Sequence, residues 1–423
     1  MTRTPLDLTR RTTLALLPAG LLISGCQQSA SNPEIDLLQS LIDDPEGARA
    51  PAAGFVLMRG GEIMAEQAVG IASGLSAEEA AAGIPQRVFT TDMPFRCASI
   101  SKIAVAIAAL ELHREQVLDM DGDIAPFLPA PLRHPQYPET PISLRMLLSH
   151  TSGLRDPEAY WVAHPGSIAS VLSEGLFAEP RVPGSWFEYC NLNYGIAATV
   201  LENASGERFD QLAKRLVLEP RGLRGNFNWG GVDASYKQTA ATLYRETEAG
   251  WQVQMDGPDI LSDPNPLYLK EDGADLSTYT LGQNGTLFSP QGGLRASLKE
   301  LALFASGLKD LPELTQPVWS LNDAMDNGDH DQRYFLSFGT GTQTHFAGES
   351  LWPGETMVGH HGEAYGLYAG AFYLPGQDVS LAYAVTGTPQ TPPARSPKHP
   401  ALDLFTAKLM QAVRQAYDES RQA

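Results

Sequence analysis

The sequence predicts a mixed α/β (α+β) fold, in which an antiparallel sheet is flanked by helices and joined to an all-α region. Strand-like segments lie near both ends of the chain, and the segments between them have helical character. A sheet built from such distant segments must accommodate the intervening helices as an insertion. With 423 residues, 43% of them hydrophobic, the chain can form one large domain or two of ordinary size.

The N-terminal part predicts a helix followed by a hairpin. Residues 34–42 (EIDLLQSLI) have the apolar spacing of an amphipathic helix. Residues 54–73 contain two strand-like runs on either side of Gly60 and Gly61, a pair typical of a tight turn.

The central part predicts helices. Residues 101–116 (SKIAVAIAALELHREQ) are apolar on more than one face, which indicates a buried helix. The segments 193–206 and 209–223 are helical in pattern, and each ends near a glycine. The stretch 226–285 is loop-rich and carries no clear element.

Strands return at 334–344, 366–375 and 379–387, where apolar and small residues alternate, and 402–419 predicts a closing helix. We therefore expect one domain over 34–418. Its α/β part should lie at about 34–98 and 285–418, and its helical part at about 99–284.

The first 25 residues resemble an export signal. Arg10 and Arg11 precede a short apolar run that ends in LISGC, at Cys26, and the run is too short to span a membrane. Small residues directly before a cysteine resemble the cleavage site of bacterial lipoproteins. Cys26 is therefore expected to be lipidated, with residues 26–33 as a tether, and a plain secretory signal is the alternative.

This leader predicts export to the periplasmic side of the cell envelope and membrane attachment through the N-terminal lipid. Gln27, rather than Asp, follows the cysteine, which in a Gram-negative bacterium implies the outer membrane. TRRTTL also resembles a twin-arginine signal but lacks the usual consensus residues.

The charge excludes some partners. The formal net charge is −19, and about −21 once residues 1–25 are removed. A chain this acidic is not expected to bind nucleic acid or anionic lipid through its charge. After processing, the cysteines that remain are Cys97 and Cys190, which predict two buried thiols rather than a disulfide framework, although pairing stays open.

Ser99 and Lys102 are the first candidate catalytic residues. They lie three residues apart at an expected helix start, on one face, so that the amine can reach the hydroxyl. Burial and the helix dipole disfavour a cation there, which lowers the pKa of Lys102 and lets it accept the serine proton. Spacing alone leaves open that Ser99 only caps the helix, or that Ser101 is the nucleophile.

Tyr189 and Asn191 form a second candidate pair, in a Tyr-x-Asn pattern. A phenol near cationic groups can ionise partly and relay a proton, and an amide can hold a substrate carbonyl. An aromatic residue and an amide in a loop are also common without any catalytic role.

His360, His361 and Gly362 lie on a predicted strand. Glycine in a strand often marks close approach by a ligand, and a histidine beside it can bind a carboxylate or donate a proton. A metal site formed by both histidines and Glu363 is a less favoured alternative, because neighbouring strand residues point to opposite faces. No cysteine and histidine spacing indicates zinc, and no cofactor is expected.

Five blocks in this order carry a resemblance to a family: FRCASISK, ISLRMLLSHTSGL, PG…FEYCNLNYG, SPQGGLRASLKELALF and GHHGEAYG. They resemble the serine hydrolases related to class C β-lactamases and D-Ala-D-Ala carboxypeptidases. The resemblance runs from about residue 35 to 415 and implies a β-lactamase/transpeptidase-like fold, with the site between the α/β and helical parts.

The resemblance implies roles by position. Ser99 would form the acyl-enzyme, Lys102 and Tyr189 would shuttle the proton, and Asn191 would orient the substrate. The backbone N–H groups of Ser99 and Glu363 would form the oxyanion hole. His150 is expected to be structural, and Gln291 to Leu294 (QGGL) to shape a turn near the site.

The chain departs from the family pattern at His360-His361-Gly362, which replaces Lys-Thr-Gly. A histidine weakens the fixed positive charge that β-lactamases use against the carboxylate of the drug. Glu363 adds a negative charge near the same pocket if its side chain faces inward. Cys97 and Cys190 replace residues that are more often Ile and Ser.

The sequence therefore predicts an acyl-transferring serine hydrolase that acts on a small-molecule ester, amide or peptide, as an esterase or a D-amino-acid peptidase. The alternatives are a true class C-type β-lactamase, a non-catalytic envelope protein that binds peptidoglycan or a partner on the same fold, and a metallohydrolase.

Overall fold

The computed structural model describes residues 38–42, 50–177, 179–262, 268–269, 274–331, 333–348, 350–388, 395–396 and 399–422. The chain divides into two units, Met1–Asn32 and Pro33–Ala423, and every described residue belongs to the second unit. The predicted leader, Cys26 and the tether lie outside the described residues. Within the described part, no helix has the length and apolarity needed to cross a membrane.

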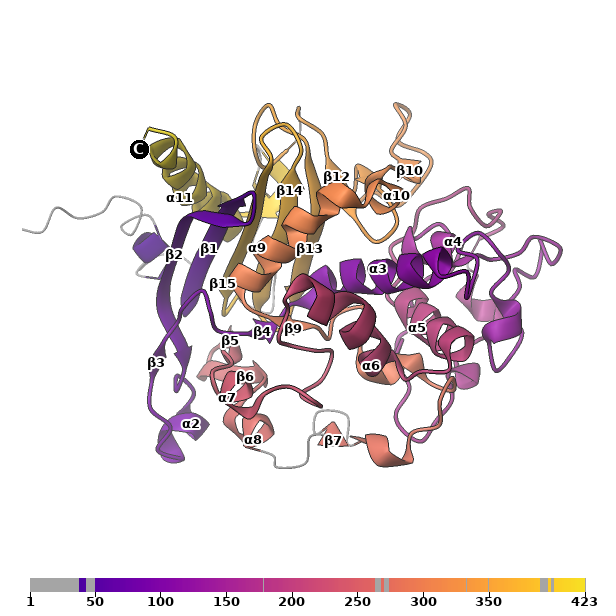
Figure 1. The fold of residues 1–423 in the computed structure, drawn as a ribbon, viewed down its shortest axis with the longest axis horizontal. Coiled ribbons are helices and arrows are strands. Elements are labelled where there is room, and N and C mark those ends of the chain that lie inside the picture. Colours follow the sequence, from indigo (N-terminus) through magenta and orange to yellow (C-terminus); the bar gives the residue numbers. More distant parts are fainter. Residues whose placement is uncertain are drawn as a thin grey trace, which may run out of the picture. The chain divides into compact units, whose positions relative to one another are not determined.

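The described residues form an antiparallel sheet of nine strands, in the order β10-β11-β12-β13-β14-β15-β1-β2-β3 (Figure 1). Strands from both ends of the chain meet in its centre, where β15 pairs with β1. The predicted antiparallel sheet with flanking helices is thereby confirmed. In chain order the strands are β1 (Ala52–Arg59), β2 (Glu62–Ser73), β3 (Arg87–Val88), β10 (Trp319–Ser320), β11 (Ser337–Phe338), β12 (Gln343–His345), β13 (Met357–Ala364), β14 (Leu367–Leu374) and β15 (Val379–Thr386).

Helices cover both faces of the sheet, which explains why its central strands are apolar almost throughout. Phe55 and Leu57 of β1 belong to the core that includes residues of helix α11 (Leu404–Ser420). Val56, which points to the opposite face, belongs to the core beneath α9 (Leu298–Ser306). The hairpin at Gly60 and Gly61 and the C-terminal helix are both as predicted.

The helical part begins and ends beside one short strand pair. Strand β4 (Phe95–Arg96) pairs with β9 (Arg295–Ala296), so the chain leaves the sheet region and returns to it at the same place (Figure 1). Helix α3 (Ser101–Arg114) follows β4 after one 3-10 turn, Ala98–Ile100, and is buried along most of its length, as predicted. The other helices between the two strands are α4 (Leu144–Leu148), α5 (Leu192–Ser205), α6 (Phe209–Ala213), α7 (Ala234–Gln238) and α8 (Pro258–Leu261).

Two segments differ from the prediction. The stretch 334–344 contains the short strands β11 and β12, because the chain turns between them at Gly341, whose φ is 75°. The stretch 226–285 contains a hairpin, β5 (Leu243–Thr247) and β6 (Gly250–Met255), outside the main sheet. Most of its residues are only partly buried, so the alternation that marks a strand is weak there.

The remaining elements are short. They are α2 (Ala77–Ala81), α10 (Pro312–Thr315), β7 (Tyr268–Leu269), β8 (Ala274–Asp275), β16 (Arg395–Ser396) and β17 (His399–Asp403).

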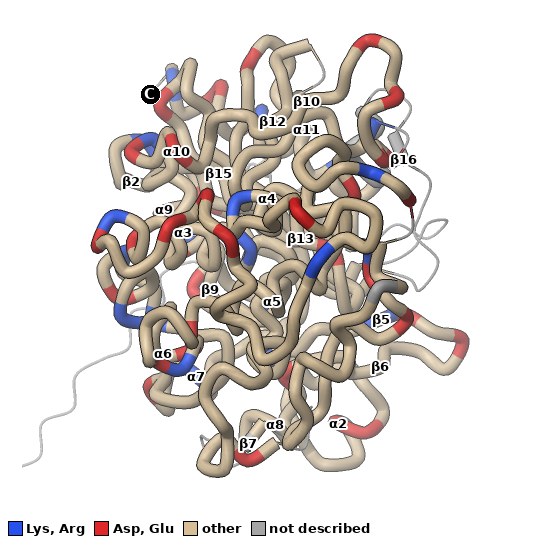
Figure 2. Tube along the Cα trace, turned by 90° about the vertical axis from the view of Figure 1, so that its right-hand side faces the viewer, with Lys and Arg blue, Asp and Glu red and all other residues tan. Residues whose placement is uncertain are grey.

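Acidic and basic residues are spread over the face drawn in Figure 2, and many lie in loops and at the ends of elements. Both Cys97 and Cys190 are free and buried, in agreement with the expectation of two buried thiols.

Candidate active site

Ser99 lies in a single 3-10 turn, Ala98–Ile100, directly before α3. It does not cap this helix, because the N-cap position of α3 is Ile100 and has no side-chain cap. The hydroxyl of Ser101 is fully buried, where it donates to the Ala98 carbonyl and accepts from the N–H of Leu294. Ser101 thus has structural contacts, whereas Ser99 lines a cavity of about 290 Å³.

Lys102 joins Ser99 to two other segments. Its Nζ atom donates to Ser99 Oγ at 2.9 Å, to Asn191 Oδ1 at 2.9 Å and to the Gln291 carbonyl at 3.0 Å. The side chain is fully buried, and burial lowers the pKa of Lys102 to about 7, an effect that the negative charge of Asp156 opposes. A substantial fraction of the amine is therefore neutral near pH 7, and the neutral form can take a proton from Ser99.

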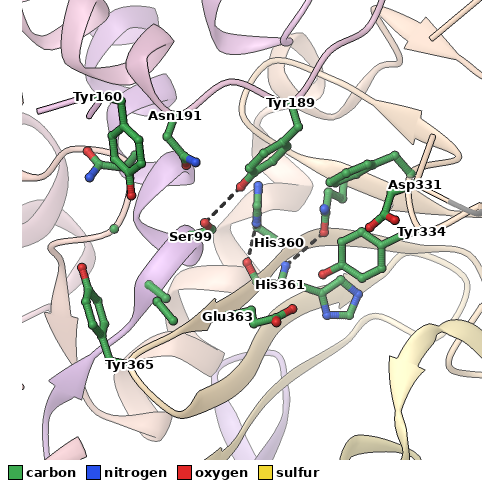
Figure 3. A pocket seen from close by; sticks show the side chains of 16 residues that line it. Ser99, Tyr160, Tyr189, Asn191, Asp331, Tyr334, His360, His361, Glu363 and Tyr365 are labelled. Atoms are coloured by element: carbon green, nitrogen blue, oxygen red, sulfur yellow. Dashed lines mark hydrogen bonds between the residues drawn. The ribbon is translucent and has the colours of Figure 1, made fainter. Parts of the chain in front are cut away.

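Tyr189 approaches Ser99 from the other side, and its hydroxyl donates to Ser99 Oγ at 3.0 Å (Figure 3). The ring is held between His150 and Phe335, whose ring centroids lie 4.3 and 5.0 Å away in stacked geometry. Burial raises the pKa of Tyr189, which opposes the partial ionisation expected from the sequence. The phenol is therefore a neutral hydrogen-bond donor to Ser99 in this structure.

His150 supports this arrangement without reaching Ser99. Its Nδ1 atom accepts the N–H of Cys190 at 3.0 Å, next to Tyr189 in the chain. Burial, and then the nearby Lys102, lower the pKa of His150 well below its ordinary value, so the ring is neutral. These contacts agree with the structural role expected for His150.

Asp156 is a residue of the site that the sequence did not indicate. Its carboxylate accepts the backbone N–H and the side-chain amide of Asn191, each at 2.9 Å, and the N–H of Leu192 at 2.8 Å. It also accepts the thiol of Cys190 at 3.4 Å. Asp156 thus satisfies two free N–H groups at the start of α5, and it turns the amide so that Asn191 Oδ1 faces Lys102.

Gly362 brings strand β13 against the turn that carries Ser99. A Cβ atom at Gly362 would lie 2.5 Å from the carbonyl oxygen of Cys97 and 3.5 Å from Cβ of Ala98. The sequence indicated close approach by a ligand, but the close approach is made by the protein's own backbone. Ser99 and Glu363 consequently line the same cavity.

His360 and His361 both line this cavity but make separate contacts. Nδ1 of His360 lies 2.5 Å from the carbonyl oxygen of His361, and burial is the main cause that lowers the pKa of His360 to about 3. Nε2 of His361 lies 3.0 Å from Nε2 of His345, and its Nδ1 lies 2.9 Å from the Tyr383 hydroxyl. Among the described residues, no group of three or more metal-binding side chains is arranged to hold an ion.

The predicted turn at Gln291 to Leu294, together with segments distant from it in the sequence, completes the cavity. The expected turn is present, since the N–H groups of Gly292 and Gly293 donate to the Ser289 carbonyl at 2.8 and 2.6 Å. Gln291 of this turn and Tyr365 of the GHHGEAYG block line the cavity as well. Further lining residues come from segments with no motif, which is why the sequence did not reveal them. They are Tyr160, Asp331, Tyr334, Phe335 and Gln343.

In this architecture a serine hydroxyl lies between a buried amine and a phenol, an arrangement in which an adjacent base can activate the serine as a nucleophile. The chain belongs to the Beta-lactamase family, whose model matches residues 38–404, most of its length.

The chain is similar to several characterised proteins. It is 27% identical over 139 residues to the D-alanyl-D-alanine-carboxypeptidase/endopeptidase AmpH of Escherichia coli, which covers 31% of this chain and 36% of AmpH. It is 31% identical over 196 residues to Esterase EstB of Burkholderia gladioli, which covers 42% of this chain and 46% of EstB. The matched segments thus span less than half of either relative.

The fold is similar to a solved structure, a β-lactamase/D-alanine carboxypeptidase of Yersinia pestis complexed with citrate. The TM-score is 0.61 with 15% sequence identity, and the match covers 92% of this chain and 98% of the other. At this identity the likeness shows the fold.

Proposed function

We propose that the protein hydrolyses a small-molecule ester, amide or peptide through an acyl-enzyme on Ser99, as an esterase or a D-amino-acid peptidase. The observation that carries this proposal is the position of Ser99 Oγ, which lies 2.9 Å from Lys102 Nζ and 3.0 Å from the Tyr189 hydroxyl. A serine becomes a nucleophile when an adjacent base can take its proton.

In the first step, neutral Lys102 takes the proton from Ser99, and Ser99 Oγ bonds to the substrate carbonyl carbon. The negative charge moves to the carbonyl oxygen, for which the N–H groups of Ser99 and Glu363 are the proposed donors. The bond to the leaving group then breaks. The leaving atom takes a proton from Tyr189, and Lys102 returns its proton to the tyrosine.

In the second step, water repeats the sequence on the acyl-enzyme. Neutral Lys102 takes the proton of the water by way of the Tyr189 hydroxyl, which gives its own proton to the amine as it accepts one from water. The hydroxide oxygen bonds to the acyl carbon, and the bond to Ser99 breaks as the serine recovers a proton from Lys102. The alignment of Asn191 by Asp156 supports a role for the amide in holding Lys102 and the substrate.

The nucleophile is tested by intact mass of wild type, Ser99→Ala and Ser101→Ala after exposure to an activated ester, a D-Ala-D-Ala peptide, nitrocefin and a fluorophosphonate. We expect a covalent adduct on wild type and Ser101→Ala but none on Ser99→Ala. An adduct that persists in Ser99→Ala contradicts the assignment. Absence of any adduct on wild type favours the alternative, a non-catalytic envelope protein that binds a partner on this fold.

An esterase or peptidase is preferred over a β-lactamase because His360 is neutral in this structure and replaces a cation. Rapid turnover of nitrocefin, comparable to that of an ester, would favour the β-lactamase alternative. A lipid-anchored position at the periplasmic side of the envelope is likewise proposed, and rests on the sequence around Cys26. Loss of fatty-acid labelling in Cys26→Ser tests it, and labelling that persists in this variant contradicts it.

A further inference from the structure

The cavity beside Ser99 is lined by two carboxylates and by neutral polar and aromatic side chains. Glu363 and Asp331 are the charged side chains among the described lining residues, and neither lysine nor arginine is found among them. Both carboxylates belong to exposed residues at the cavity. Figure 3 shows Asp331 and Tyr334 on one side of Ser99, and Tyr160 and Tyr365 on the other.

Two basic side chains lie behind this lining. Lys102 is fully buried, and its amine is hydrogen-bonded to Ser99, Asn191 and Gln291. The guanidinium of Arg96 lies 4.8 Å from the centre of the Tyr365 ring and donates to the Ser289 hydroxyl and the Gly292 carbonyl. Each is therefore engaged with the protein rather than directed at a substrate anion.

His360 presents no free N–H donor to a substrate. Its Nδ1 atom contacts the His361 carbonyl oxygen, and because a carbonyl can only accept, Nδ1 must carry the ring proton. Nε2 is then unprotonated in the neutral ring. It is shielded from solvent and has no hydrogen-bond partner among the described residues, although His360 lines the cavity. A substrate group that reaches this atom must donate a hydrogen bond.

The position of Glu363 brings its negative charge close to the substrate carbonyl that would react. Its proposed role is to donate its backbone N–H to the substrate oxygen, so its carboxylate lies only a side-chain length from that oxygen. An amine attached next to the carbonyl carbon would come within reach of this carboxylate. The tyrosines at the cavity add aromatic faces and hydroxyl oxygens, both of which favour an ammonium group.

On this basis we propose that the substrate carries a positively charged amine close to its scissile carbonyl, and that Glu363, assisted by Asp331, selects it. This inference rests on the proposed hydrolase function and specifies its substrate class. Carboxylate-bearing substrates are disfavoured by the same groups, since like charges in a shared cavity repel.

Matched substrates test the proposal. Alanine p-nitroanilide, in both enantiomers, carries the amine, and propionyl p-nitroanilide has the same shape without it. The quantity to measure is the ratio of kcat/KM for the charged and neutral compounds, in wild type, Glu363→Gln and Asp331→Asn. Comparing this ratio between proteins cancels the higher intrinsic reactivity of the aminoacyl compound.

We expect Glu363→Gln to lower the ratio by about five-fold or more, and Asp331→Asn to lower it by less. Rising salt should weaken the preference in wild type and much less in Glu363→Gln. The control is Glu62→Gln, which removes the same charge from an exposed residue of the distant strand β2 and should keep the wild-type ratio. If the anilides are not cleaved, alaninamide and propionamide are compared as competitive inhibitors of activated-ester hydrolysis.

A ratio that is the same in wild type and both variants, while Ser99-dependent turnover of activated esters persists, overturns the selection of an amine and leaves the hydrolase function standing. The selection of an amine is also overturned if the wild type discriminates against the charged compound more strongly than Glu363→Gln does. Absence of any Ser99-dependent acylation overturns the hydrolase function and, with it, this inference.

Discussion

The carboxylate of Asp156 holds both the backbone N–H and the side-chain amide of Asn191 at 2.9 Å, and the amide oxygen then accepts from Lys102 at the same distance. This chain of contacts connects a loop residue to the amine beside Ser99. Asp156 also acts on that amine through its charge, which opposes the fall in the pKa of Lys102 caused by burial.

We predict that Asp156→Asn moves the acid limb of kcat/KM to lower pH. Burial lowers the pKa of Lys102, and the negative charge of Asp156 raises it, so removal of this charge lowers the pKa further. The amide of Asn191 also loses one fixed partner, and kcat should fall by roughly ten-fold or more. The control is Asp323→Asn, which removes the same charge from an exposed residue. A fall in activity with no shift of the pH profile would indicate a role in structure alone.

A second prediction concerns the pH dependence of the wild type. The pKa of Lys102 is lowered to about 7 by burial. At lower pH the amine is protonated and cannot accept the serine proton, so kcat/KM for a neutral ester should rise as the pH increases through about 7. The variant Lys102→Arg tests whether Lys102 causes this rise. Its side chain stays charged, so its activity should fall by roughly a thousand-fold. A profile that is flat between pH 5 and 9 would contradict Lys102 as the base.

Tyr189→Phe separates the phenol hydroxyl from its ring. The stacked contacts with His150 and Phe335 can be kept, so the free energy of unfolding should change by less than about 1 kcal/mol. Loss of the hydroxyl that donates to Ser99 should lower kcat by roughly a hundred-fold. Stopped-flow kinetics and urea unfolding measure the two effects. Unchanged kcat would show that the hydroxyl takes no part in proton transfer.

The sequence predicted those parts of the site that depend on local spacing or on family motifs. Ser99 and Lys102 are three residues apart at a helix start, so their contact follows from helix geometry. Tyr189, Asn191 and His360 were indicated by the resemblance, and the structure places all three at the same cavity. Their roles in catalysis and substrate binding stay predictions.

Other parts of the site depend on tertiary structure and could not be predicted. Asp156 lies in a loop, and it meets Asn191 only because the helical part folds back on itself. His345 of β12 meets His361 of β13 through their side chains, although the strand register places His345 opposite Met357. The β5–β6 hairpin was missed because its partly buried residues give little alternation. In each case the missing information is a contact between distant segments.

The last prediction tests the close approach of β13 to the turn of Ser99. In Gly362→Ala the new Cβ would meet the Cys97 carbonyl oxygen at 2.5 Å. The backbone fixes the position of the Cβ, and the carbonyl is itself a backbone group, so neither can rotate away. We expect the free energy of unfolding to fall by about 1–3 kcal/mol and kcat to fall as β13 moves away from Ser99. Urea unfolding and ester hydrolysis measure the two effects.

The control is Gly307→Ala, where a Cβ meets no atom within 4 Å and φ is −69°, so neither stability nor activity should drop. If Gly362→Ala keeps wild-type stability but loses activity, the alanine obstructs the cavity itself. If it keeps both, β13 tolerates displacement, and the backbone N–H of Glu363 is not held close enough to Ser99 to act as the second oxyanion donor. The proposed oxyanion hole would then have to be assigned to another backbone group.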